Sequence, residues 1–145
     1  MATSNKLRTD LFKTVDREDT RVIAVRDSLT LAEPPLTIQD LDALHCKRGR
    51  LGIGWHFVVF PAGEIVLGRG INTCGSHSKD FDRISVGIGV VGGVVQDEKG
   101  KRVTTYTRTE EQLEALDDLI EVLKELYPAV EVHDTPRDHS CAPMI

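Results

Sequence analysis

The sequence predicts a single α/β domain built on a mixed β-sheet. Its 145 residues fit one compact core better than two. Short β-branched runs typical of strands are separated by stretches with helical periodicity, and one Gly-containing connection of hairpin length joins two strand-like runs. The resulting order of strand, helix, hairpin, strand, helix and strand favours a mixed sheet with helices packed on it.

The first strand and the first helix are predicted between residues 21 and 49. Residues 21–25 (Arg-Val-Ile-Ala-Val) form a β-branched run typical of a buried central strand, so residues 26–28 lie at a strand end. Thr37 stands three residues before Asp40, which resembles a capping box at the start of a helix. This helix should stop near Gly49.

A hairpin and a further strand follow. Residues 55–60 and 64–67 are strand-like and flank Pro61-Ala-Gly63, so an antiparallel pair is expected. Residues 84–91 form another strand, in which two glycines, at 87 and 89, share one face. Glycines placed in this way indicate that a helix or a ligand packs very close to that face.

The longest helix follows Thr107 and Thr109, which both offer caps, and it ends before Pro128. Its apolar positions recur at steps of three and four residues: Leu113, Leu116, Ile120, Leu123 and Leu126. Residues 130–132 then form a last short strand that leads into an irregular tail.

Composition excludes several classes of function. With 18 basic and 23 acidic residues the net charge is −5, the wrong sign for general nucleic-acid binding. No apolar run reaches the ~18 residues that a membrane span needs. Residues 1–20 form a polar arm without the apolar core of a secretory signal, so residues 21–145 are the expected domain and the cytoplasm is the expected location.

The tail is the first place where chemistry is expected. His133, His139 and Cys141 lie within nine residues, in a loop beyond the last strand. Imidazole and thiolate are ligands that zinc prefers, and a catalytic zinc needs only three protein ligands. The alternative is an ordinary polar tail in which Cys141 packs as a small hydrophobe. The odd number of cysteines, which includes Cys46 and Cys74, argues against a disulfide framework.

Three other histidines are candidates. His45 borders the apolar face of the first helix, where a partly buried and satisfied histidine is expected. His56 follows Trp55 in a strand, so alternation places these two side chains on opposite faces. His77 lies in a loop of small residues, where polar side chains more often carry function.

Several motifs together resemble the type 2 N-acetylmuramoyl-L-alanine amidases, whose fold peptidoglycan recognition proteins share. They are residues 54–57 (Gly-Trp-His-Phe), 63–66 (Gly-Glu-Ile-Val), 68–69 (Gly-Arg), 75–78 (Gly-Ser-His-Ser) and 85–93 (Ser-Val-Gly-Ile-Gly-Val-Val-Gly-Gly). The resemblance implies helices on both sides of the sheet. It also implies a zinc cleft that hydrolyses the amide between muramic acid and L-alanine in peptidoglycan.

The resemblance also assigns site positions. His133 and Cys141 fall on the second and third zinc ligands, and Arg26 falls on the first, where a guanidinium has no lone pair to give. Trp55, which has no hydroxyl, falls on an assisting tyrosine, and His139 falls on an assisting lysine. The implied zinc site is therefore degenerate.

Two readings remain open at this point. In the first, the protein is a phage-type endolysin that hydrolyses peptidoglycan in a reorganised site, with His139 as the third zinc ligand. In the second, it is a pseudoenzyme that has lost zinc, in which Arg26, Trp55 and His77 bind peptidoglycan or a small anion. A phage member of the family also restrains an RNA polymerase, so a protein partner of that kind, met in the host cytoplasm, is a further implication.

Overall fold

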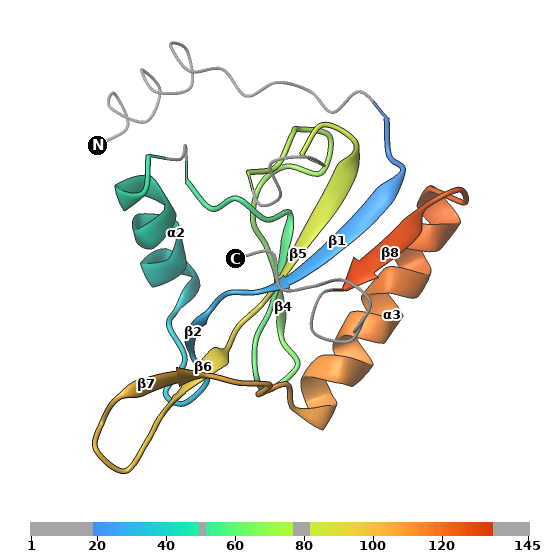
Figure 1. The fold of residues 1–145 in the computed structure, drawn as a ribbon. Coiled ribbons are helices and arrows are strands. Elements are labelled where there is room, and N and C mark those ends of the chain that lie inside the picture. Colours follow the sequence, from blue (N-terminus) through green and yellow to red (C-terminus); the bar gives the residue numbers. More distant parts are fainter. Residues whose placement is uncertain (1–18, 50–51, 77–81, 135–145) are drawn as a thin grey trace.

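The computed structural model describes residues 19–49, 52–76 and 82–134. Its main element is a five-stranded sheet with the strand order β4-β3-β5-β1-β8 (Figure 1). The strands are β1 (Val22–Asp27), β3 (Phe57–Val59), β4 (Ile65–Leu67), β5 (Ser85–Val90) and β8 (Glu131–Asp134). Neighbouring strands run parallel except β3 and β4, which form the predicted antiparallel hairpin. The expectation of a mixed sheet is confirmed.

A second, three-stranded sheet has the order β2-β6-β7 and was not predicted. Its strands are β2 (Thr30–Leu31), β6 (Gly93–Gln96) and β7 (Arg102–Thr104). The charged residues 97–101 connect β6 and β7, which pair as an antiparallel hairpin. All three residues of β7 are exposed, so this strand has no apolar alternation by which it could be recognised.

Both predicted helices are present, and each begins with a capping box. Helix α2 (Ile38–Lys47) is capped by Thr37 with Asp40, and α3 (Glu110–Leu126) by Thr109 with Gln112. One apolar position of α3 differs from expectation, because Leu126 is 60% exposed and the buried series stops at Leu123. Within the described part of the chain, neither helix is long and apolar enough to cross a membrane.

The two helices cover opposite faces of the five-stranded sheet (Figure 1). One core lies under α3 and consists of Ile23, Val25, Val59, Val86, Ile88, Val90, Leu116, Ile120 and Leu123. The other lies on the side of α2 and consists of Leu41, Ile53, Trp55, Val58 and Val91. We call these two sides the α3 face and the α2 face of the sheet.

Gln112 attaches α3 to the ends of two strands. Its buried Nε2 donates to the carbonyl oxygens of Val59 at 3.2 Å and Val91 at 2.9 Å, while Oε1 accepts from the Thr109 N–H at 3.0 Å. Every polar atom of this side chain is therefore used.

Replacing Gln112 with leucine should lower the free energy of unfolding by about 2 kcal/mol, because the carbonyls of Val59 and Val91 each lose a hydrogen bond from the buried amide. Urea denaturation measures this effect. Glu114→Leu, at an exposed position of the same helix, is the matched control and should change stability by less than about 0.5 kcal/mol. Equal losses in the two variants would show that the Gln112 bonds contribute nothing.

Candidate functional site

Arg26, Trp55 and His133 are brought together on the α2 face. Arg26 pairs with Gly89 across β1 and β5, and His133 pairs with Ala24 across β8 and β1. Paired residues of parallel strands point to the same face, and so do residues two apart in one strand. Since Gly89 lies under the Trp55 ring, the side chains of Arg26 and His133 share the face that Trp55 covers.

The Trp55 indole packs directly on Gly89. A Cβ at this glycine would lie 2.3 Å from Cδ2 of the indole, so no larger residue fits without moving the ring. The indole also meets the His45 imidazole, with ring centroids 4.6 Å apart. Trp55 is only 6% exposed, and its Nε1 has no hydrogen-bond partner among the described residues. The close contact expected from the two-glycine strand is therefore made by a side chain of the protein itself.

Arg26 links the carboxyl ends of two strands. It is half-buried, and its Nη1 donates to the carbonyl oxygens of Val25 at 2.9 Å and His133 at 3.1 Å. A guanidinium keeps its charge at any physiological pH. The α2 face therefore carries a fixed positive charge where β1 and β8 end.

His133 is part of a strand rather than of the loop expected beyond it. Strand β8 runs to Asp134 because β1 pairs with it as far as Val25. The imidazole is 29% exposed, and its Nε2 lies 3.5 Å from the exposed Glu131 carboxylate. His133 is thus held on rigid secondary structure beside Arg26.

The other expected site residues, His77, His139 and Cys141, lie outside the described residues. Of the expected ligand positions that are described, only His133 has a lone pair to offer, because Arg26 is a cation. Within the described ranges, no group of three His, Cys, Asp or Glu side chains could hold a metal ion. The described residues do not fit a three-ligand zinc site.

His45 and His56 are structural. His45 is buried, and its Nδ1 accepts from the Gly54 N–H at 2.8 Å. His56 is also buried; its Nδ1 accepts from the Gly87 N–H at 2.9 Å and its Nε2 lies 2.8 Å from the Thr73 carbonyl oxygen. His56 therefore extends the pairing of β3 with β5 and does not face the site.

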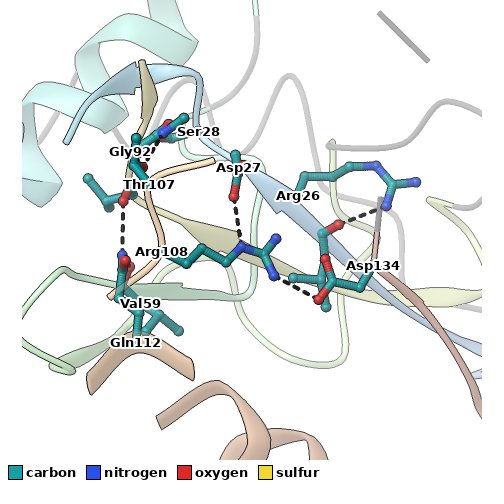
Figure 2. A network of polar contacts seen from close by, with 12 residues as sticks. Arg26, Asp27, Ser28, Val59, Gly92, Thr107, Arg108, Gln112 and Asp134 are labelled. Carbon is teal, nitrogen blue, oxygen red and sulfur yellow. Dashed lines mark hydrogen bonds and ion pairs between the residues drawn. The ribbon is translucent and has the colours of Figure 1, made fainter. Parts of the chain in front are cut away.

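An ion triad lies behind the site, on the α3 face (Figure 2). Arg108 donates from Nε to Asp27 at 3.0 Å and from Nη1 to Asp134 at 2.7 Å. The three side chains are nearly buried, with exposures of 1% for Arg108, 11% for Asp27 and 6% for Asp134. This triad was not predicted from the sequence. Alternation at the two strand ends places both aspartates on one face, but nothing in the sequence shows that Arg108 reaches them.

Burial and charge act against each other in the triad. Burial raises the pKa of Asp27 above its ordinary 3.8 and outweighs Arg108, whose charge and hydrogen bond lower it. Burial alone would lower the pKa of Arg108, but the hydrogen bond and charge of Asp134, together with those of Asp27, raise it overall. Arg108 therefore remains charged at physiological pH.

Asp27 should affect stability in a pH-dependent way. Because its pKa is higher in the folded protein, its contribution is fully present below the unfolded pKa of about 3.8 and is lost as the pH rises through the folded pKa. The free energy of unfolding of the wild type minus that of Asp27→Asn should therefore fall as the pH rises above 3.8. Urea denaturation at a series of pH values measures this difference. Asp118→Asn, at an exposed position of α3, controls for net charge, and a difference that grew with pH would contradict the expectation.

Comparisons with known proteins agree with this fold. The N-acetylmuramoyl-L-alanine amidase family model matches residues 19–142. An endolysin of Klebsiella phage KP32 is 33% identical over 111 residues, which cover 77% of this chain and 71% of that protein. Peptidoglycan-recognition protein LE of Drosophila melanogaster is 39% identical over 56 residues, 38% of this chain and 16% of that protein.

The solved structures agree as well. The N-acetylmuramoyl-L-alanine amidase LysC from Clostridium intestinale matches with a TM-score of 0.65 and 26% identity, covering 85% of this chain and 76% of that one. A mixed sheet with a helix on each face is thus the shared architecture. The chain belongs to the N-acetylmuramoyl-L-alanine amidase family.

Proposed function

We propose that this protein binds peptidoglycan on the α2 face of its sheet and does not hydrolyse it by zinc chemistry. The observation that carries the proposal is Arg26, a fixed cation on the same face as His133 and Trp55. The similar proteins support the choice of ligand, since they include an amidase and a protein named for peptidoglycan recognition.

The chemistry of the face suits an anionic, partly apolar ligand. Peptidoglycan stem peptides carry carboxylates, and a guanidinium binds a carboxylate through two parallel hydrogen bonds. The Trp55 Nε1 is buried without a partner among the described residues, so it is a second donor only for a ligand group that reaches below the surface of this face. Arg26 and Trp55 are close, because Arg26 pairs with the glycine under the indole and paired strands lie about 4.8 Å apart.

The same arginine opposes metal-assisted hydrolysis. A catalytic zinc supplies a water of lowered pKa and polarises the scissile carbonyl, and it needs ligands that donate a lone pair. Arg26 offers no lone pair, and its charge repels a divalent cation. His133 together with residues outside the described ranges would have to form the whole ligand set.

Two assays on one preparation of the full-length protein test the two halves of the proposal. Co-sedimentation with purified sacculi measures binding, and we expect the protein to pellet equally well with and without a chelator. The release of new amino groups from sacculi measures amide hydrolysis, and we expect none when zinc is added. Failure to pellet would overturn the binding half, and zinc-dependent release of amino groups would overturn the other half.

A further inference from the structure

Arg108 connects the carboxyl ends of β1 and β8 from the side opposite the site. It precedes the N-cap of α3, and its side chain is 1% exposed on the α3 face. One edge of its guanidinium bonds Asp27, the residue after Arg26, and another bonds Asp134, the residue after His133 (Figure 2). Arg108 therefore bonds the residue that follows Arg26 in β1 and the residue that follows His133 in β8.

Side-chain contacts from two arginines hold the end of β8 in place. Among the described residues, β8 is an edge strand of four residues that pairs on one side, with β1. Its last two residues are held from opposite faces by two arginines. Arg26 donates to the His133 carbonyl at 3.1 Å on the α2 face, and Arg108 donates to the Asp134 carboxylate at 2.7 Å on the α3 face.

We propose that Arg108 is a positioning residue for ligand binding on the α2 face. It sets the separation of Arg26 and His133 through Asp27 and Asp134 and does not touch the ligand itself. The planar guanidinium suits this role, because it bonds two carboxylates in a fixed geometry, whereas an ammonium acts as a single mobile charge. The identity of the ligand in this inference rests on the proposed function. The positioning of His133 by Arg108 does not depend on that function.

The first test is Arg108→Lys, which keeps the charge between the two carboxylates but loses the fixed fork. The ring resonances of His133, assigned with a His133→Gln variant, should shift in a heteronuclear NMR spectrum at constant pH. Amide hydrogen exchange in β8 should become faster. The affinity for a soluble muramyl peptide, measured by calorimetry, should fall about 3- to 10-fold. Arg102→Lys, at an exposed position of β7, is the matched control and should change none of these.

A second variant keeps the inference testable if Arg108→Lys does not fold. Asp27→Ala removes one arm of the triad and leaves one arginine paired with one carboxylate, so no buried charge is left without a partner. It should shift the His133 resonances in the same direction as Arg108→Lys does, and it should also lower the affinity for the muramyl peptide.

If either variant melts at a lower temperature but keeps the wild-type His133 spectrum and affinity, Arg108 has only a structural role and the inference is overturned. If the wild type binds no muramyl peptide while the His133 resonances still shift in the variants, the proposed function fails and the positioning of His133 stands.

Discussion

The Arg26→Ala protein is expected to bind peptidoglycan at least about 10-fold more weakly than the wild type. A hydrogen bond to a charged group contributes about 1.5–3 kcal/mol, and 1.4 kcal/mol corresponds to a factor of 10 in affinity. Co-sedimentation with sacculi and calorimetry with a muramyl peptide measure the loss. The bonds of Arg26 to the Val25 and His133 carbonyl oxygens are lost in this variant, so the melting temperature is measured beside the affinity to separate a loss of fold from a loss of binding.

Two variants separate the geometry of Arg26 from its charge. Arg26→Lys keeps the positive charge without the two-pronged geometry, so its affinity should fall between those of the wild type and Arg26→Ala. Arg102→Ala removes the same charge from the exposed strand β7 and should bind like the wild type. Wild-type affinity in Arg26→Ala would mean that peptidoglycan, if bound, is bound elsewhere.

Gly89→Ala is expected to have the largest effect on stability, about 3 kcal/mol. The new methyl group would lie 2.3 Å from Cδ2 of Trp55, so the indole has to leave its place on the sheet and lose its contact with His45. Because this face also carries Arg26, binding of peptidoglycan should weaken in the same variant.

Fluorescence reports this displacement directly, since Trp55 is the only tryptophan. Its emission should move to longer wavelength in Gly89→Ala as the indole becomes exposed, and chemical denaturation measures the loss of stability. Gly70→Ala is the matched control, because a Cβ there meets only the Thr73 methyl group at 3.8 Å. An unchanged emission maximum in Gly89→Ala would show that the strand moves to make room for the methyl group and that the indole keeps its position.

The main sheet and both helices could be predicted because their signals are local. The capping box at Thr37 and Asp40 is visible within four residues, and the β-branched run at 21–25 marks a buried strand. The second sheet could not be predicted in this way. Its strands are two to four residues long, and β7 has no buried side chain to create a pattern.

The site could be predicted in part. The paired glycines of β5 indicate a close neighbour, and alternation in β1 separates Arg26 from Asp27, but the register that places Arg26 and His133 on one face is seen only in the structure. That this neighbour is Trp55 depends on the path of the chain before β3, and the reach of Arg108 depends on the loop before α3. Both contacts depend on the tertiary structure, which residue spacing alone does not determine.

The most direct test of a degenerate zinc site is the zinc content of the full-length protein. Protein purified without chelator or metal-affinity resin is incubated with zinc, separated from unbound metal, and measured by plasma mass spectrometry. If Arg26 stands where a ligand is required, zinc should remain far below one atom per chain. A stoichiometry of about one atom per chain would contradict this, because it would mean that His133 and residues outside the described ranges complete a site without the first ligand.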